Sequence, residues 1–89
     1  MKNVTIYTGD LCGYCLMAKE LLDSKNILYE EINIGVEKRI KNEMIKLSGG
    51  KTSVPQIFFG KLHIGGFDEL YKLVKKKKLD RMLNRETSA

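Results

Sequence analysis

The sequence predicts an α/β fold in which a four-stranded mixed sheet is flanked by helices, and three observations lead to this prediction. Four short runs rich in alternating or β-branched apolar residues have the pattern of strands. Between them, apolar residues recur at intervals of three and four, as they do along one side of an amphipathic helix. The chain has 89 residues, a length that suits one hydrophobic core, so we expect residues 1–89 to form a single domain.

The first half of the chain predicts two parallel strands joined by a helix. Residues 4–7 form the first strand, residues 16–25 the helix and residues 27–34 the second strand. The helix is long enough for a right-handed crossover, which places the two strands side by side and parallel. A second helix follows and ends at Gly49-Gly50. Its apolar stripe consists of Val36, Ile40, Met44 and Leu47.

The second half predicts an antiparallel hairpin and a final helix. A third strand over residues 54–59 turns at Gly60-Lys61 into a fourth strand over residues 62–64, and a two-residue turn joins antiparallel strands. The last helix follows a pair of glycines. Its inward side is expected to carry Leu70, Leu73 and Val74. The apolar pattern continues through Leu79, Met82 and Leu83, and we expect either a break or a shift of face at the lysine run that interrupts it. The order strand–helix–strand–helix–strand–strand–helix is that of the thioredoxin-like fold.

Composition and charge argue against several classes of protein. The formal net charge is +5, and much of the excess lies in the run Lys75-Lys76-Lys77-Lys78. No aromatic platform or reading helix accompanies these lysines, so we expect no nucleic-acid binding and interpret the run as solvated, with weak steering of anionic partners as the alternative. No apolar run approaches the roughly 20 residues of a membrane span, and no signal peptide is visible. Two cysteines without a wider disulfide framework suit a reducing, cytoplasmic location.

The motif Cys12-Gly13-Tyr14-Cys15 holds both cysteines of the chain and lies between a strand and a helix. The first thiol is therefore expected at a helix N-terminus, where unpaired N–H groups and the helix dipole favour the nucleophilic thiolate. A C-x-x-C in this context is typical of thioredoxin-like redox proteins. A zinc site needs about four ligands, and the only further soft ligand is His63. A structural disulfide would close too short a loop to stabilise the fold much. Two inert thiols, or a metal site shared between chains, remain the alternatives.

Two further segments have both a functional and a simpler interpretation. Pro55 opens the third strand, where a missing N–H is tolerated, and a cis bond there would turn the backbone of Val54 toward an extended peptide. The simpler interpretation is a proline that starts a strand. Residues 65–68 place two glycines at the start of the last helix, where a backbone can approach an anion closely. The simpler interpretation is an N-cap formed by Asp68.

Taken together, these features resemble the glutaredoxin family over essentially the whole chain. The matching segments are Tyr7-Thr8, Cys12-Gly13-Tyr14-Cys15, Thr52-Ser53-Val54-Pro55-Gln56-Ile57-Phe58 and His63-Ile64-Gly65-Gly66-Phe67-Asp68-Glu69-Leu70. Three motifs at the family's spacing are more specific than C-x-x-C alone. The resemblance implies a cis Val54–Pro55 bond and a pocket that binds glutathione.

The resemblance also implies an activity, that of a glutathione-dependent thiol–disulfide oxidoreductase acting on protein disulfides and glutathionylated mixed disulfides. Cys12 would attack as a thiolate, and Cys15 would resolve the mixed disulfide. The implied glutathione-binding residues are Tyr14, Lys51, Ser53, Val54, Pro55, Gly66, Phe67 and Asp68. Within this set, the backbone of Val54 would pair with the cysteine of glutathione, while Phe67 and Asp68 would hold its γ-glutamyl end.

Two positions depart from the family's pattern. Many dithiol members have a proline where this chain has Gly13, and many have a lysine where it has Gly9. A small residue at position 13 resembles members that hold a [2Fe–2S] cluster between two subunits, with Cys12 and glutathione as ligands. An iron–sulfur carrier or sensor is therefore one alternative, and a thioredoxin-like electron donor to ribonucleotide reductase is another. Without a cluster we expect a monomer, with His63 on an exposed strand face and in no catalytic role.

Overall fold

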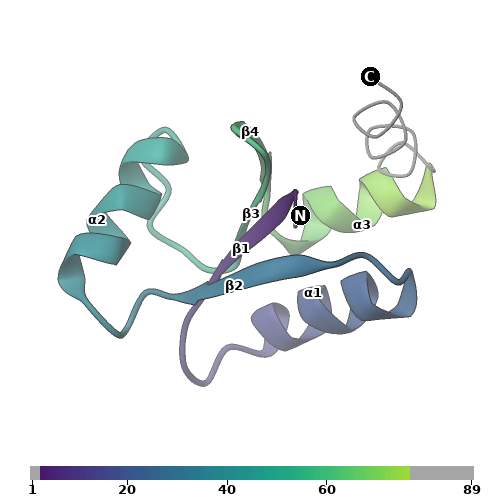
Figure 1. Cartoon of the computed structure of the whole chain (residues 1–89), viewed down its shortest axis with the longest axis horizontal. Helices are drawn as coiled ribbons and strands as arrows, with labels where there is room; N and C mark the ends of the chain where they lie inside the picture. The colour runs from purple at the N-terminus through teal and green to yellow at the C-terminus, as the bar shows by residue number, and fades with distance from the viewer. Residues whose placement is uncertain (1–2, 77–89) are drawn as a thin grey trace.

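The computed structural model describes residues 3–76, in which three helices cover a four-stranded sheet (Figure 1). In chain order the elements are β1 (Val4–Thr8), α1 (Gly13–Ser24), β2 (Tyr29–Asn33), α2 (Lys38–Leu47), β3 (Gln56–Phe59), β4 (Leu62–Gly65) and α3 (Phe67–Lys75). This order confirms the predicted thioredoxin-like α/β fold. The expected continuation of the last helix through Leu79, Met82 and Leu83 lies outside the described residues. None of the helices within residues 3–76 is long and apolar enough to cross a lipid bilayer.

The strands lie in the order β2-β1-β3-β4. β1 pairs with β2 in parallel, while the pairs β1–β3 and β3–β4 are antiparallel, so the sheet is mixed as predicted. In the β1–β3 register, Tyr7 lies opposite Gln56. The end of β1 and the start of β3 therefore lie side by side. This arrangement brings the loop before α1 close to the loop before β3, although some 40 residues separate them in the sequence.

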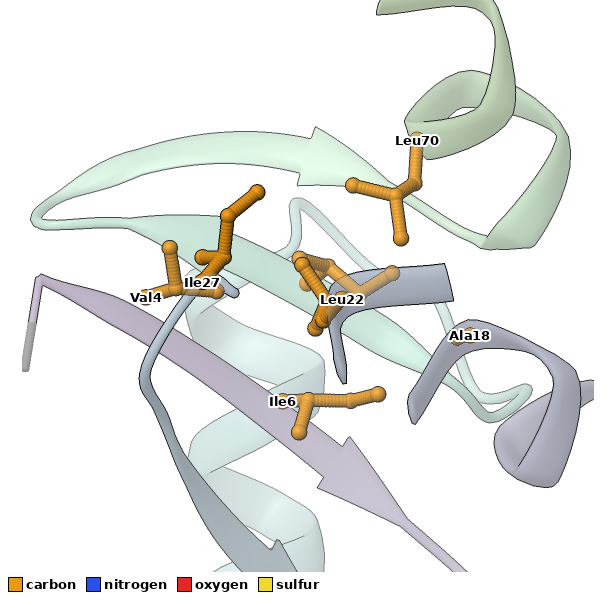
Figure 2. Packing of buried hydrophobic residues seen from close by; sticks show 7 residues of the cluster. Val4, Ile6, Ala18, Leu22, Ile27 and Leu70 are labelled. Carbon is orange, nitrogen blue, oxygen red and sulfur yellow. The ribbon is translucent and has the colours of Figure 1, made fainter. Parts of the chain in front are cut away.

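Side chains of β1 alternate between two cores, one on each face of the sheet. Val4 and Ile6 point toward the face that α1 and α3 cover, while Tyr7 points toward the face that α2 covers. The first core consists of Val4, Ile6, Ala18, Leu22, Ile27, Ile57 and Leu70 (Figure 2). The smaller second core consists of Tyr7, Met44 and Phe58. Full burial of each large aliphatic side chain contributes about 1.5–3 kcal/mol, so the first core holds α1 and α3 firmly against the sheet.

The predicted apolar stripe of α2 is only partly correct. Met44 is buried and Ile40 is half-buried, but Val36 and Leu47 are 72% and 52% exposed. Val36 precedes the first residue of α2 and Leu47 is its last, so neither lies where the helix faces the sheet. Ile45 packs against the second core in their place.

Two strands begin later than predicted because of their local backbone. Before β2, Asn26 takes the left-handed conformation with φ 57°, and Ile27 donates its N–H to the carbonyl of Leu22 at 3.0 Å. This is the Schellman motif that ends many helices, and it delays β2 to Tyr29. β3 begins at Gln56, after Pro55, which has no N–H to donate to the ladder.

Candidate active site

Cys12 occupies the N-cap of α1, with an extended backbone at φ −111° and ψ 105°. Its Sγ accepts a hydrogen bond from the backbone N–H of Cys15 at 3.1 Å, and its carbonyl accepts one from Leu16 at 3.2 Å. The helix thus begins at Gly13 rather than at residue 16, and the motif forms its first turn. A sulfur in this position receives an N–H that would otherwise have no partner, at the positive end of the helix dipole.

The two thiols differ in access to solvent. Both are free; Cys12 is half-buried, whereas Cys15 is 2% exposed. The pKa of the Cys15 thiol is raised to about 11, chiefly by burial and to a smaller extent by the hydrogen bond with Cys12. Cys15 is therefore a protonated, enclosed thiol at neutral pH, and Cys12 is the one that a disulfide substrate can reach.

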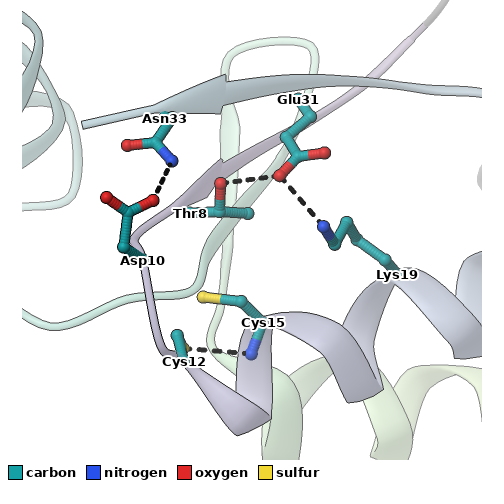
Figure 3. Close-up of polar contacts among 7 residues, drawn as sticks. All are labelled: Thr8, Asp10, Cys12, Cys15, Lys19, Glu31 and Asn33. Carbon is teal, nitrogen blue, oxygen red and sulfur yellow. Dashed lines mark hydrogen bonds and ion pairs between the residues drawn. The ribbon is translucent and has the colours of Figure 1, made fainter. Parts of the chain in front are cut away.

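A cluster of polar side chains lies beside Cys15 (Figure 3). The carboxylate of Glu31 accepts hydrogen bonds from the Thr8 hydroxyl at 2.8 Å and from Nζ of Lys19 at 3.1 Å. The Thr8 hydroxyl chiefly, and then Lys19, hold the pKa of Glu31 below its usual value, and the same contact raises the pKa of Lys19. These bonds join β1, β2 and α1 next to the redox motif.

A second set of hydrogen bonds holds the loop that precedes Cys12. The side-chain amide of Asn33 donates to the carboxylate of Asp10 at 3.0 Å (Figure 3). The oxygen of this amide accepts a hydrogen bond from the N–H of Gly35 at 2.7 Å. Within this loop Leu11 has φ 53°, a left-handed conformation that is uncommon for a large apolar residue. Asp10, Leu11 and Asn33 were not predicted from the sequence as residues of the site.

The Val54–Pro55 segment lies across from Cys12, and its peptide bond is cis, as expected. The Cys12 thiol donates a hydrogen bond to the carbonyl oxygen of Val54, with sulfur and oxygen 3.7 Å apart. Gly9 also approaches this segment, because a Cβ added there would lie 3.1 Å from Cγ2 of Val54. Any larger residue at position 9 would require Val54 to move by a few tenths of an ångström.

A groove of about 290 Å³ opens beside this contact. It is lined by Tyr14, Ser53, Val54, Pro55, Gly66, Phe67, Asp68 and Glu69. Seven of the eight predicted glutathione-binding residues thus meet in one place, from α1, the loop before β3 and the start of α3. The eighth, Lys51, lines a neighbouring cavity that shares Ser53, Gly66 and Glu69 with the groove. Glu69 was not among the predicted residues.

Comparison with known proteins decides the family. The sequence profile of the glutaredoxin family matches residues 4–64. The chain is 45% identical to glutaredoxin 1 of Rickettsia prowazekii over 97% of this chain and 92% of the relative. It is 48% identical to glutaredoxin 3 of Escherichia coli K12 over 93% of this chain and 99% of the relative. The chain belongs to the glutaredoxin family. It is thus a thiol–disulfide oxidoreductase of a glutathione-dependent family.

The fold comparison agrees with this assignment. The structure of a buckwheat glutaredoxin–glutathione complex superposes on this glutaredoxin with a TM-score of 0.83 and 29% sequence identity. The match covers 93% of this chain and 77% of the buckwheat chain.

The start of α3 corrects one interpretation of the sequence. The N-cap of this helix is Gly66, and its N–H donates to the carboxylate of Glu69 at 2.7 Å. Glu69, rather than Asp68, is therefore the carboxylate that bonds back to the N-cap residue. Asp68 lies in the first turn, lines the groove and makes no side-chain hydrogen bond within residues 3–76, so its carboxylate can meet a ligand.

His63 is half-buried, so its expected position on an exposed strand face is wrong. Gln56 donates from Nε2 to the backbone carbonyl of Ser53 at 3.0 Å, and that oxygen can only accept. Oε1 of Gln56 must then accept from Nε2–H of His63, 2.6 Å away. The pair lines the cavity beside the groove and holds Ser53 through Gln56, and nothing in its geometry makes His63 a base for the thiols.

Within residues 3–76, no three His, Cys, Asp or Glu side chains converge on one point as a metal site requires.

Proposed function

We propose that this glutaredoxin reduces protein disulfides and glutathionylated mixed disulfides, with Cys12 as the nucleophile, Cys15 as the resolving thiol and glutathione bound in the groove. The observation that carries the proposal is the 3.7 Å contact between the Cys12 sulfur and the Val54 carbonyl. Because Val54 lines the groove, a glutathione held there by its backbone would present its sulfur to Cys12.

With a glutathionylated substrate, one thiol is sufficient. The Cys12 thiolate attacks the glutathione sulfur, a new Cys12–glutathione disulfide forms, and the substrate sulfur leaves as a thiolate that takes up a proton. The thiolate of a second glutathione then attacks the bound glutathione sulfur. Oxidised glutathione leaves, and the Cys12 thiolate is restored.

With a protein disulfide, both thiols are needed. Cys12 forms a mixed disulfide with one substrate sulfur, and Cys15 then attacks the sulfur of Cys12. The Cys12–Cys15 disulfide forms, and the proton of the Cys15 thiol ends on the departing substrate thiolate. Two glutathione molecules return the protein to the dithiol state. Burial suits Cys15 to this role, because a disulfide of another protein cannot reach it.

The groove supplies complementary groups for the rest of glutathione. Free N–H groups at the start of α3 suit the γ-glutamyl carboxylate, and Asp68 suits its ammonium group. Tyr14 and Phe67, whose ring centroids are 6.1 Å apart, form an apolar wall. Lys51 lies in the adjoining cavity, where its ammonium suits the second carboxylate of the tripeptide.

Substitution of Asp68 tests the groove. Asp68→Ala should lower kcat/KM for a glutathionylated substrate about tenfold or more, because a charge-assisted hydrogen bond contributes roughly 1.5–3 kcal/mol. Lys51→Ala should cost less, since an exposed ion pair contributes only about 0–1 kcal/mol. Glu20→Ala is the matched control, because Glu20 carries an exposed carboxylate on α1 and does not line the groove. Full turnover in both groove variants, or turnover by thioredoxin reductase in place of glutathione, would contradict the proposal.

The difference in solvent access between Cys12 and Cys15 favours a second candidate function, the binding of a [2Fe–2S] cluster. Such a cluster is usually held by four thiolates, and one chain can offer Cys12 alone, because Cys15 is enclosed. Two copies of Cys12 and two glutathione thiols would complete the set. The residues fit the cluster only in that form, so binding would require glutathione and a dimer; without a cluster we expect a monomer.

A further inference from the structure

The exposed aromatic residues of this glutaredoxin gather in one place. The chain has four tyrosines and three phenylalanines, and all seven lie within the described residues. Only two of them are exposed, Tyr14 at 61% and Tyr71 at 49%. Both contact Phe67, with ring centroids 6.1 Å and 5.9 Å away and interplanar angles of 34° and 33°. We refer to Tyr14, Phe67 and Tyr71 as the aromatic row.

The row begins at the redox motif and leads away from the groove. Tyr14 follows Cys12 by two residues, and both Tyr14 and Phe67 line the groove. Tyr71 lies one turn further along α3 and is not among the residues that line the groove. A ligand confined to the groove would therefore leave the ring of Tyr71 uncovered. Single exposed tyrosines are common, but a continuous aromatic surface that starts at a reactive thiol is typical of a binding surface.

The charge changes sign along the same helix. The first turn of α3 carries Asp68 and Glu69, and its last turn carries Lys72 and Lys75. Lys75 follows Tyr71 by four residues, so the two share one side of the helix, and both are exposed. The surface beyond the row is therefore cationic.

We propose that the aromatic row receives the polypeptide part of the substrate, an extended segment with an apolar side chain close to its reactive cysteine and an acidic side chain further along. This inference rests on the proposed function, because it assumes that glutathione occupies the groove. Side chains on one side of an extended segment repeat about every 7 Å, close to the 5.9 Å between the rings of Phe67 and Tyr71. The acidic side chain would then meet Lys75.

The test compares two glutathionylated substrates. One is the mixed disulfide of glutathione with 2-mercaptoethanol, which has no polypeptide to contact the row. The other is a glutathionylated peptide with leucine two residues from its cysteine and aspartate two residues beyond that leucine, because two extended residues span about the same 6–7 Å as one helical turn from Tyr71 to Lys75. Tyr71→Ser should lower kcat/KM for the peptide about three- to tenfold, the range of one aromatic contact, and change it less than about twofold for the small disulfide. Tyr71→Phe should retain the wild-type values.

Two controls separate a contact from a general effect. Leu28→Ser removes another exposed apolar side chain, 70% exposed and outside the site, and should change neither substrate. A second peptide with serine in place of leucine should already be slower with the wild type and should lose little more with Tyr71→Ser. The inference would be overturned if Tyr71→Ser lowered kcat/KM equally for the small disulfide and the peptide. It would also be overturned if Tyr71→Ser lowered kcat/KM as much for the serine peptide as for the leucine peptide. Failure of the proposed function would look different, because the wild type would then not turn over the small disulfide with glutathione.

Discussion

Asn33, at the end of β2, holds the carboxylate of Asp10 through a 3.0 Å hydrogen bond from its side-chain amide. Asp10 lies two residues before Cys12, so this bond joins the loop that carries the nucleophile to β2, the edge strand next to β1. The oxygen of the same amide accepts the N–H of Gly35 at 2.7 Å. Asn33 therefore holds both the loop before α1 and the loop before α2.

Asn33→Ala removes both bonds and should lower the free energy of unfolding by about 1–3 kcal/mol, since each bond contributes about 0.5–1.5 kcal/mol. Asp10→Ala removes the first bond alone and should cost about half as much. Both variants should speed amide hydrogen exchange in residues 9–12, and urea unfolding gives the stability change. Unchanged exchange in Asp10→Ala would show that the bond does not order the loop.

Glu31 should make stability depend on pH in the acid range. Its pKa is lowered in the folded protein, chiefly by the Thr8 hydroxyl and also by Lys19. The resulting stabilisation is present above the ordinary carboxyl pKa of 4.5 and is lost as the pH falls through the lower folded value. Because the side chain of Glu31 is 39% exposed, we expect less than about 1 kcal/mol.

Urea unfolding at pH 5 and at pH 3 checks this expectation. Glu31→Gln should lose less stability between the two pH values than the wild type does. Glu30→Gln, a neighbouring exposed residue on β2, is the control and should behave as the wild type. If Glu31→Gln lost as much stability between pH 5 and pH 3 as the wild type, the acid sensitivity would have to come from other carboxyl groups.

The enclosed thiol should react far more slowly than the accessible one. With a pKa of about 11, roughly one Cys15 in ten thousand is ionised at pH 7, and its side chain is also shielded from reagents. Iodoacetamide should therefore alkylate Cys12 in Cys15→Ser at least about 100-fold faster than Cys15 in Cys12→Ser. The Cys15 rate should rise about tenfold per pH unit from pH 7 toward pH 10, because only the thiolate reacts. In denaturant the alkylation rates of the two cysteines should converge. Comparable rates in the folded variants would contradict the assignment of Cys12 as the nucleophile and Cys15 as the resolving thiol.

Residues with a strong local pattern could be predicted from the sequence, as β1 and the two cysteines illustrate. The alternation of Val4, Ile6 and Tyr7 defines two faces whatever the neighbours are, and the spacing of Cys12 and Cys15 is set within one helical turn. Residues whose role depends on distant partners could not be predicted. Asn33 bonds Asp10 only because β1 and β2 are parallel neighbours in the observed register.

Competition between nearby side chains explains other errors. Asp68 and Glu69 both lie in the first turn of α3, and a sequence pattern cannot tell which carboxylate turns back to the N–H of Gly66. The groove was predicted more completely, because Val54 and Phe67 belong to motifs whose spacing is shared across the family. Tyr71 lies beyond those motifs, and its contact with Phe67 follows from the path of α3 over the sheet.

Gly13→Pro should stabilise the fold, although it alters the redox motif. Gly13 is the first residue of α1, a position that favours proline, and nothing lies within 4 Å of a Cβ placed there. Cys12 is already extended, as a residue before proline must be. Since proline restricts the unfolded chain, we expect a gain of about 0.4–1 kcal/mol in urea unfolding. A loss of stability would mean that the N–H of Gly13 has a partner that the proline removes.

The same variant separates the two candidate functions. Thiol transfer needs only Cys12 and the groove, so Gly13→Pro should keep turnover of a glutathionylated substrate within a few-fold of the wild type. Cluster assembly requires the loop to move as two copies meet, and a proline would fix its backbone. Anaerobic reconstitution of wild type, Gly13→Pro and Cys12→Ser, with and without glutathione, should give a coloured dimer for the wild type with glutathione and less or none for the others. A cluster that survives Cys12→Ser, or forms in a monomer without glutathione, would exclude the four-thiolate arrangement, because its ligands would then have to come from residues other than Cys12.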